Sequence, residues 1–235
     1  MIKEKVYTFW EGEMPEYIKL CMKTWKFDYV LLNYYNLNQY TDLKADDRLK
    51  RFSLPKIADV VRVHVLRDNG GYWLDTDTIM LKDELPEENM IGYPAERGNT
   101  IGFLHTEPHT DMYERWASHQ DCVIRTTLLD QHTRWDVMGN AFTDDYLPRH
   151  PEITIADVTN RWPETYMFME SQYHVSRRFK YEKFYFDASY NLSDLRPTNM
   201  LMLHNSWTPN DYKMLSEEEV LKRDCTLSNI LREVL

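Results

Sequence analysis

The sequence predicts a mixed α/β fold with a central, mostly parallel sheet flanked by helices. A β-like run at residues 6–10 is followed by a helical pattern and then by a second β-like run at residues 29–34. A strand, a helix and a strand in succession usually place the two strands parallel in one sheet. A second and more apolar helical pattern, at residues 51–66, leads into a third run that is rich in aromatic and β-branched residues. This alternation of element types is typical of an α/β protein.

The first helix is predicted between the two N-terminal strands. Pro15 closes a short polar turn, and proline is favoured in the first turn of a helix because its missing N–H would have no partner there. The helix is expected to end near Trp25. Residues recur at helical spacing along one face, which predicts that this face is buried: Tyr17, Leu20, Cys21, Thr24 and Trp25.

Start and stop signals bound the second helix. Ser53 is a suitable N-cap, Pro55 lies in the first turn, and Asn69-Gly70-Gly71 is a strong stop signal. Residues 72–81 are then predicted to form a strand that enters a loop at residues 82–83. The apolar residues of the helix are too dense for a surface stripe, so it should be largely buried: Ile57, Val60, Val61, Val63, Val65 and Leu66.

Later segments continue the alternation. Residues 91–110 read as short strands separated by turns, residues 111–118 as a helix, and residues 153–158 and 200–204 as strands. Apolar residues recur at helical spacing near the C-terminus, so residues 216–235 are predicted to be helical. No internal repeat, low-complexity tract or linker interrupts the chain, and we therefore expect one domain over residues 1–235.

Composition and charge limit the classes of partner. The 235 residues carry a formal net charge of −10, which disfavours a large nucleic-acid interface because phosphate binding depends on clustered Lys and Arg. No apolar run approaches the roughly 20 residues that span a bilayer, and the N-terminus lacks a signal-peptide pattern. We therefore expect a cytoplasmic protein without a transmembrane segment. A peripheral contact with a membrane is compatible with this expectation.

Cysteine and aromatic content narrow the chemistry further. Cys21, Cys122 and Cys225 are odd in number and far apart, without the paired spacing of a zinc site or the density of a disulfide scaffold. Aromatic residues make up 14% of the chain. Their faces suit sugar rings and nucleobases, and they equally suit the filling of a core. The composition leaves both uses open.

Asp75 and Asp77 form the motif with the clearest chemistry. On the predicted strand their side chains point to the same face, while Leu74 and Thr76 point to the other. Neighbouring carboxylates suit Mg²⁺ or Mn²⁺, which prefer oxygen ligands and are often shared between carboxylates and substrate phosphates. Such a cation neutralises the charge that develops on a departing diphosphate. The alternative is a solvated turn, because two aspartates at this spacing often occur by chance.

A pair of histidines later in the chain is a weaker candidate for metal binding than the two aspartates. His105 and His109 are four residues apart, but Pro108 and the surrounding turn residues argue against a helical zinc pair.

The two aspartates belong to a longer pattern: Ala58-Asp59-Val60-Val61-Arg62, Leu66, Asn69-Gly70-Gly71-Tyr72 and Leu74-Asp75-Thr76-Asp77. This pattern resembles the central motif of the bacterial capsular-polysaccharide glycosyltransferases. It is also similar to glycosyltransferases with a DxD sugar-binding region, including the fungal α-mannosyltransferases and the clostridial toxin glucosyltransferase domains. The resemblance implies the GT-A fold of nucleotide-diphospho-sugar transferases. It extends in patches to Tyr7-Thr8-Phe9-Trp10, Cys21, Trp25, Gly102-Phe103-Leu104, His109 and His204-Asn205-Ser206-Trp207.

The resemblance implies a role for each carboxylate and for the helix before them. Asp77 would bind the metal directly, and Asp75 would hold the donor ribose and reach the metal directly or through water. Asp59 and Arg62, three apart on one helical face, would hydrogen-bond the hydroxyls of the donor sugar. The guanidinium would also offset diphosphate charge. Without the resemblance, an ordinary ion pair within the helix is the simpler interpretation of these two residues.

Residues at both ends of the chain complete the implied donor site. Thr8, Phe9 and Trp10 would form the nucleobase and ribose pocket at the end of the first strand, where open α/β sheets bind ligands. The alternative is that these aromatic residues belong to the core. Trp207 would close over the diphosphate or the donor, and Ser206 beside it would also belong to the donor-binding residues.

The sequence departs from its relatives at two places. The family usually has more residues between its histidine and the Ser-Trp pair, so either His204 or Asn205 could be the further metal ligand. On a strand the two side chains face opposite ways, and His204 is favoured because an imidazole is the stronger ligand and suits Mn²⁺ better than Mg²⁺. The second departure is Met138-Gly139-Asn140, where many relatives carry a Thr-Gly-Pro turn that lines the active site. This departure affects what the resemblance implies for the acceptor side of the site more than for the donor side.

The implied reaction moves a sugar from a nucleotide-sugar to a hydroxyl of a saccharide acceptor, in polysaccharide or glycan synthesis. A UDP-sugar donor is favoured over a GDP-sugar, and retention of configuration is favoured because the relatives mostly retain it. A glycoside hydrolase is disfavoured, because its two carboxylates must flank the scissile bond roughly 5 to 9.5 Å apart. Asp75 and Asp77, as neighbours on one face of the predicted strand, could not lie on both sides of a sugar. A viral-type transferase acting on modified nucleic acid and a non-catalytic sugar-nucleotide-binding module stay open as alternatives.

Overall fold

The computed structural model describes residues 4–85, 87–92, 99–127, 133–156, 177–194 and 199–235. The chain divides into two compact units, and the segments that form them alternate along the sequence. The first unit contains residues 1–12, 28–75 and 86–158, and the second contains residues 13–27, 76–85 and 159–235. The expectation of one domain over residues 1–235 stays a prediction.

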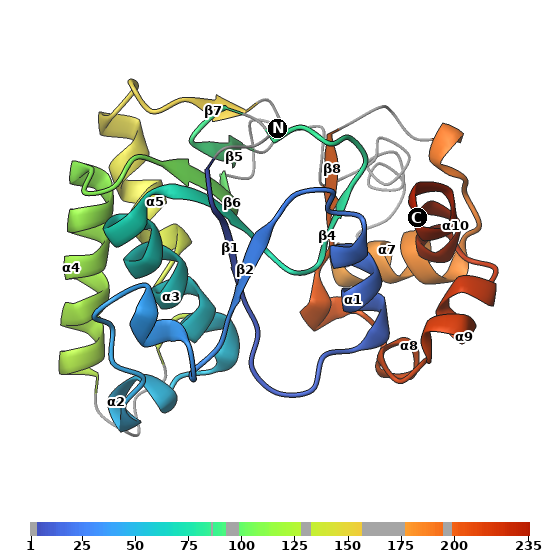
Figure 1. The fold of residues 1–235 in the computed structure, drawn as a ribbon, viewed down its shortest axis with the longest axis horizontal. Coiled ribbons are helices and arrows are strands. Elements are labelled where there is room, and N and C mark those ends of the chain that lie inside the picture. Colours follow the sequence, from blue (N-terminus) through green and yellow to red (C-terminus); the bar gives the residue numbers. More distant parts are fainter. Residues whose placement is uncertain (1–3, 86, 93–98, 128–132, 157–176, 195–198) are drawn as a thin grey trace. The chain divides into compact units, whose positions relative to one another are not determined.

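The first unit is built on a six-stranded sheet in the order β2-β1-β3-β6-β5-β7 (Figure 1). β1 pairs in parallel with β2 and β3, and β5 with β7, whereas β6 is antiparallel to β3 and β5. Three of these five pairings are parallel, so the predicted mixed, mostly parallel α/β sheet is confirmed. The strands are β1 (Val6–Phe9), β2 (Tyr29–Leu32), β3 (Gly71–Leu74), β5 (Met90–Gly92), β6 (Asn99–Thr106) and β7 (Ile155–Ala156). The helices described in this unit are α2 (Asp47–Lys50), α3 (Leu54–Asn69), α4 (Asp111–Thr126) and α5 (Asn140–Tyr146).

Helix α3 packs against β1, β3 and β6 and supplies much of the core of this unit. It begins after Ser53 with Pro55 in its first turn, as predicted, and it ends at Gly70. Gly70 has a φ of 65°, in the left-handed region that favours glycine. The next glycine, Gly71, lies so close to β1 that a Cβ there would be 2.5 Å from the carbonyl oxygen of Lys5. The glycine pair therefore both ends α3 and lets β3 lie beside β1.

The run at residues 72–81 is not one strand, contrary to the prediction. β3 ends at Leu74, and β4 (Thr78–Met80) belongs to a separate two-stranded sheet. Aspartate disfavours strands, and the backbone between the two strands has other partners. The N–H of Asp75 donates to Gly102 at 2.8 Å, and the carbonyl oxygen of Asp77 accepts from Leu203 at 2.9 Å. The argument that both carboxylates share one face of a strand is therefore wrong.

The second unit contains β4, β8 (Met200–Met202) and several helices (Figure 1). β4 and β8 are antiparallel, and their register pairs Thr78 with Met202 and Met80 with Met200. The predicted N-terminal helix is α1 (Glu16–Lys23), with Tyr17 buried as the spacing indicates. The other α-helices described in this unit are α7 (Arg177–Glu182), α8 (Asn210–Lys213), α9 (Glu217–Lys222) and α10 (Thr226–Val234).

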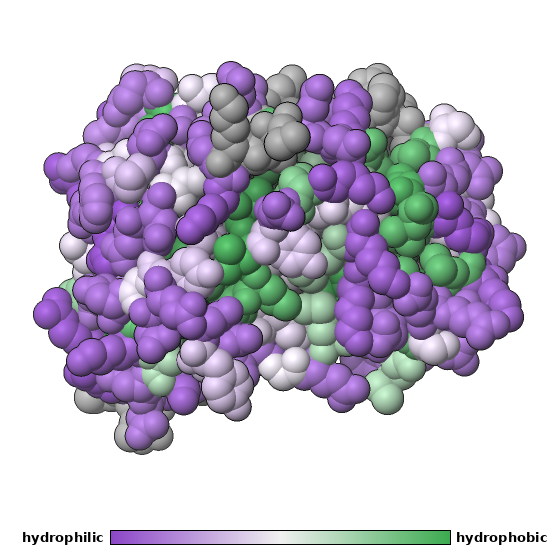
Figure 2. Space-filling model, in the orientation of Figure 1, coloured by the Kyte–Doolittle hydropathy of each residue, from purple (hydrophilic) through white to green (hydrophobic). Residues whose placement is uncertain are grey.

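The C-terminal residues form two helices, whereas the spacing predicted one helical stretch. α9 begins with a capping box between Ser216 and Glu219, and α10 begins after Cys225. Cys225 has an extended backbone, with φ −155° and ψ 161°, and this interrupts the helical path. Figure 2 shows hydrophilic residues over the outer surface of α9, where Glu218 and Glu219 are exposed.

Three other predicted elements differ in length. α4 continues to Thr126, beyond the predicted 111–118, and β8 ends at Met202, before the predicted end at residue 204. β7 covers only residues 155–156 of the predicted strand, and residues 157–158 lie outside the described residues. Over the part of the chain that the structure describes, no helix is long and apolar enough to cross a membrane.

Candidate functional site

The carboxyl ends of β1 and β3 meet at one edge of the sheet in the first unit. The parallel register pairs Tyr7 with Trp73, so Phe9 at the end of β1 and Leu74 at the end of β3 lie at the same edge. Asp75 follows directly. Open α/β sheets bind ligands outside the carboxyl ends of their strands, and this edge is therefore the expected place for a ligand.

Arg62 is the centre of a charge cluster at this edge. Its side chain, on α3, is 5% exposed, and one terminal nitrogen lies 3.0 Å from Oδ1 of Asp59 and 3.1 Å from Oδ1 of Asp75. The other terminal nitrogen donates to the carbonyl oxygen of Ile101 on β6. The guanidinium also lies 5.2 Å from the centre of the Trp73 ring. Arg62 therefore joins α3 to both β3 and β6.

The cluster holds two carboxylates and one guanidinium in a largely buried setting. Burial raises the pKa of Asp59 to about 7, although the Arg62 guanidinium opposes this rise and the Asp75 carboxylate adds to it. The side chain of Asp75 is 33% exposed, and its Oδ1 accepts a 2.9 Å hydrogen bond from the indole N–H of Trp73. Asp59 therefore changes its charge near neutral pH, whereas Asp75 is held in place by two donors.

The ion pair between Asp59 and Arg62 that helical spacing indicates is present, and it extends to Asp75. Arg62 offers little surface to a ligand, while the side chain of Asp59 is 15% exposed. In this geometry Arg62 pairs with both carboxylates. The roles of these residues toward a donor sugar stay predictions.

Two residues pack against Asp59, and the sequence reasoning missed one of them. Gln120, buried on α4, donates from its amide nitrogen to the carbonyl oxygens of Asp59 at 2.9 Å and Met138 at 2.6 Å. It was missed because a buried glutamine on a helix carries no local signal. Gly139, just before α5, leaves so little room that a Cβ there would lie 3.1 Å from Oδ2 of Asp59. Gly139 belongs to the Met138-Gly139-Asn140 turn that the resemblance singled out.

Thr8, Phe9 and Trp10 lie at the end of β1, as predicted, with different exposures. Phe9 is buried, and its ring centre lies 5.8 Å from that of Tyr34, so it belongs to the core as the alternative interpretation held. Trp10 is half-buried, and its backbone N–H donates to Leu32 at 3.0 Å. Thr8 is fully buried, and its hydroxyl has no hydrogen-bond partner among the described residues. The roles of Thr8 and Trp10 in nucleotide binding stay predictions.

In the second unit, Asp77 is bound to the segment that follows β8. Its carbonyl oxygen accepts from the N–H of Leu203 at 2.9 Å, and its Oδ2 accepts from the N–H of Asn205 at 2.8 Å. Oδ1 of Asn205 in turn accepts from the hydroxyl of Tyr17 on α1 at 2.5 Å. The structure thus brings the second aspartate of the motif beside the distant segment that the resemblance singled out.

His204, Ser206 and Trp207 lie on the turn after β8. The rings of His204 and Trp207 have their centres 4.0 Å apart, and the backbone N–H of Trp207 donates to His204 at 2.9 Å. Ser206 is exposed and Trp207 is half-buried. Because β8 ends at Met202 and residues 205–207 form a 3₁₀ helix, the argument that set His204 against Asn205 on alternate faces of a strand is wrong.

A metal site of three side chains is not already assembled in the described residues, where no group of three or more His, Cys, Asp or Glu could hold an ion. Asp75 and Asp77 nevertheless carry the hard oxygen donors that Mg²⁺ and Mn²⁺ prefer, and the predicted metal site stays a prediction. A ring nitrogen of His105 lies 2.9 Å from a carboxylate oxygen of Glu4, and a ring nitrogen of His109 lies 3.0 Å from one of Glu114. The interpretation that the two histidines are not a zinc pair stays a prediction.

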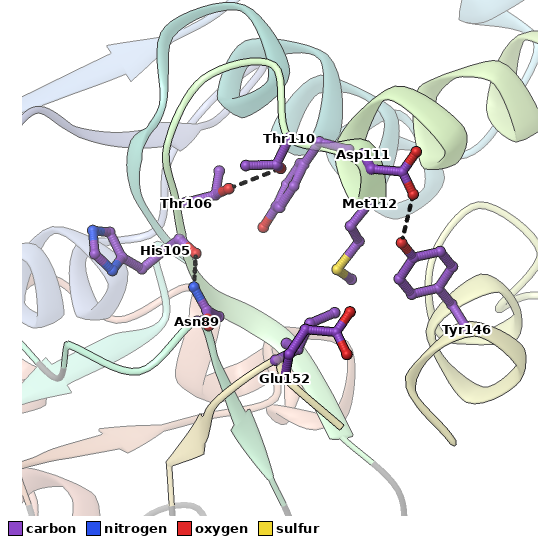
Figure 3. Close-up of a pocket in the computed structure, with 10 residues that line it drawn as sticks. Asn89, His105, Thr106, Thr110, Asp111, Met112, Tyr146 and Glu152 are labelled. Atoms are coloured by element: carbon purple, nitrogen blue, oxygen red, sulfur yellow. Dashed lines mark hydrogen bonds between the residues drawn. The ribbon is translucent and has the colours of Figure 1, made fainter. Parts of the chain in front are cut away.

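A cavity of about 220 Å³ lies elsewhere in the first unit (Figure 3). Thr106 lines it and pairs with Gly71, the first residue of β3, so the cavity lies near the opposite end of the strand that leads to Asp75. Figure 3 shows the hydroxyl of Tyr146 donating to Asp111 at its wall, at 2.9 Å. None of the predicted site residues lines this cavity, and we assign no part of the site to it.

Several solved structures resemble this chain at low identity. One is the PaToxG glycosyltransferase, with 14% identity, 64% of this chain and 70% of that chain covered, and a TM-score of 0.44. Another is the apo form of the glycosyltransferase GlyE of Streptococcus pneumoniae TIGR4, with 12% identity, coverages of 93% and 62%, and a TM-score of 0.47. A third is a glycosyltransferase involved in glycosylation of the major capsid of PBCV-1, with 11% identity, coverages of 75% and 96%, and a TM-score of 0.37.

At the level of sequence, a comparison with curated proteins finds no significant match. The model of one protein family, described as capsular polysaccharide synthesis protein, matches residues 1–132. This match covers more than half of the 235 residues and includes the whole Arg62 cluster. The chain therefore belongs to the capsular polysaccharide synthesis protein family.

Proposed function

We propose that the chain is a glycosyltransferase of polysaccharide or glycan synthesis. It would move a sugar from a nucleotide-sugar, with UDP favoured over GDP, to a hydroxyl of a saccharide acceptor. The cluster of Asp59, Arg62 and Asp75 at the carboxyl end of β3 carries this proposal, because it occurs in a member of the capsular polysaccharide synthesis family at the edge where α/β sheets bind ligands.

The charges of the cluster suit a sugar that is attached to a diphosphate. Above pH 7, where Asp59 is ionised, the cluster has more carboxylates than guanidinium groups, which favours a cation beside the exposed part of Asp75. The carboxylate of Asp59 can accept hydrogen bonds from sugar hydroxyls. Arg62 acts through these two carboxylates by fixing where they lie.

The proposed cofactor is Mn²⁺ or Mg²⁺, held by Asp75 and Asp77 with His204 as a further ligand. Carboxylate oxygens with an imidazole suit Mn²⁺ in particular. His204 is favoured over Asn205 because Oδ1 of Asn205 already accepts the hydroxyl of Tyr17. When bound, the cation would neutralise the charge that develops on the departing diphosphate.

We further propose that the reaction retains the configuration of the sugar. The bond between the anomeric carbon and the diphosphate oxygen breaks, and the acceptor oxygen bonds to that carbon on the same face. The proton of the acceptor hydroxyl passes to the departing diphosphate. The support for this part is the resemblance to families that mostly retain configuration.

The test is thermal unfolding with nucleotide and metal. We expect Mn²⁺ plus UDP to raise the melting temperature, because a ligand at about one hundred times its Kd adds roughly 2.7 kcal/mol to the free energy of unfolding. Mn²⁺ alone and UDP alone should do less, and GDP should do less than UDP. The absence of any shift with UDP or GDP in the presence of Mn²⁺ would argue decisively against a nucleotide-sugar site.

Asp77→Asn tests the metal ligand itself. The change removes a charge at nearly constant volume, so the protein should fold, lose the Mn²⁺-dependent part of the melting shift and lose turnover of UDP-sugars. Retained turnover with the same dependence on metal would move the metal away from Asp77.

A further inference from the structure

We propose that Trp135 is a stacking platform for a pyranose ring of the saccharide acceptor, an inference that rests on the proposed glycosyltransferase function. Trp135 is 76% exposed, although tryptophan is one of the most apolar side chains and is buried on average. It lies in residues 133–139, the segment that leads to Gly139 and α5. An aromatic face in water is the usual means by which a protein offers a flat apolar contact to a ring-shaped ligand.

The segment that carries Trp135 is fixed to the body of the first unit. Its backbone carbonyl oxygens accept hydrogen bonds from side chains of α3 and α4, at distances of 2.6 to 3.0 Å. A platform held in this way loses little conformational freedom when a ligand binds. The contacts are Lys56 to Thr133, Trp116 and Gln120 to Met138, and His119 to Val137.

The same segment lies against the proposed donor site. Gly139 packs on the carboxylate of Asp59, and its N–H donates to the carbonyl oxygen of Asp136 at 3.0 Å, which closes a turn. Trp135 directly precedes this turn, so its Cα lies at most about 11 Å from that of Gly139. An acceptor that extends along this segment from a sugar bound at Asp59 would therefore come within reach of the indole.

The residues beside Trp135 favour a saccharide over a protein partner. Arg134 and Asp136 form a bidentate ion pair, with Nε to Oδ1 at 3.0 Å and a terminal nitrogen to Oδ2 at 2.6 Å. These flanking charged groups can hydrogen-bond hydroxyls while the indole contacts the C–H face of a sugar ring. Both sequence neighbours of Trp135 are charged, so the exposed indole is not part of an apolar run of the kind that marks many protein-binding patches.

The experiment uses the indole N–H signal of Trp135 in a ¹⁵N-labelled full chain, identified as the signal that Trp135→Phe removes. The probes are neutral oligosaccharides of glucose, galactose, mannose and rhamnose, added with Mn²⁺ and UDP present. We expect at least one of them to shift this signal. Trp135→Ala should weaken binding of that oligosaccharide at least tenfold, and Trp135→Phe should weaken it less. Tyr29→Ala, which removes a 40% exposed aromatic residue at the start of β2, should bind as the unaltered protein does.

The outcomes separate this inference from the proposed function. If Mn²⁺ plus UDP gives no melting shift in the unaltered protein, the proposed function itself fails. If that shift is present but no oligosaccharide perturbs the Trp135 signal, or Trp135→Ala binds as tightly as the unaltered protein, the acceptor platform is refuted while the donor site stands. An unchanged melting shift in Trp135→Ala shows that the variant is folded and that its weaker oligosaccharide binding is local.

Discussion

Replacing Arg62 by methionine removes the positive centre of the buried cluster and keeps a long side chain in its place. Arg62 is 5% exposed and pairs with both Asp59 and Asp75. Removing one partner of a buried ion pair costs about 3–5 kcal/mol, because a buried charge is left uncompensated. We expect Arg62→Met to lower the free energy of unfolding by an amount in this range at pH 8.

The loss of stability caused by Arg62→Met should depend on pH, because Asp59 titrates near neutrality. Its folded-state pKa of about 7 lies above the value of about 3.9 for an unfolded aspartate. Ionised Asp59 therefore lowers the free energy of unfolding above pH 7, and this effect disappears as the pH falls toward 4. Without Arg62 the pKa of Asp59 should rise further, and each unit corresponds to about 1.4 kcal/mol. The loss caused by Arg62→Met should thus be at least about 1 kcal/mol smaller at pH 5.5 than at pH 8.

Urea unfolding, followed by circular dichroism at pH 8 and pH 5.5, measures the loss of stability caused by Arg62→Met and its dependence on pH. Arg115→Met is the matched control, because Arg115 pairs with Asp111 at 2.7 Å on the surface, with side chains 65% and 62% exposed. Surface pairs of this kind add little to stability, so the control should change little at either pH. The reasoning is refuted if Arg62→Met is no more destabilising than Arg115→Met, or if its loss is equal at pH 8 and pH 5.5.

Two further substitutions test the positions of other site residues. His204→Ala should raise the Mn²⁺ concentration needed for half-maximal turnover, whereas Asn205→Ala should do much less; the reverse order in a metal titration would place the ligand at Asn205. Gly139→Ala should crowd the side chains of Ile101 and Asp59, with a loss of about 1–3 kcal/mol in urea unfolding and a higher KM for the UDP-sugar. Unaltered stability and KM would show that the turn before α5 has room for a side chain.

Local signals were sufficient to predict α3. Ser53, Pro55 and Gly70 define where α3 begins and ends, because capping and helix termination depend on single residues and their immediate neighbours. The spacing of Asp59 and Arg62 also predicted that they share a helical face. The ion pair that Arg62 also forms with Asp75 was not predicted, since no local pattern shows that α3 packs on β3. The resemblance implied only that the three residues serve one donor site.

Features that depend on distant partners were not predictable from local patterns. Residues 78–80 are as apolar as residues 71–74, and they form a separate strand because they pair with β8. Likewise, nothing near Gln120 in the sequence indicates that it donates to the carbonyl oxygen of Asp59. No local pattern predicts that Trp135 is exposed, or that the segment carrying it is held by side chains of α3 and α4.

The pairing of β4 with β8 sets a condition on how the protein is made. Met80 pairs with Met200, so 120 residues must be synthesised after β4 before its partner strand exists. At about 5–20 residues per second this takes roughly 6 to 24 s. During that interval Ile79 and Met80, which are 0% and 3% exposed in the folded protein, lack their partner strand β8. We expect the yield of folded protein to rise when chaperones protect the growing chain, and a chain shortened before residue 200 to leave β4 unpaired.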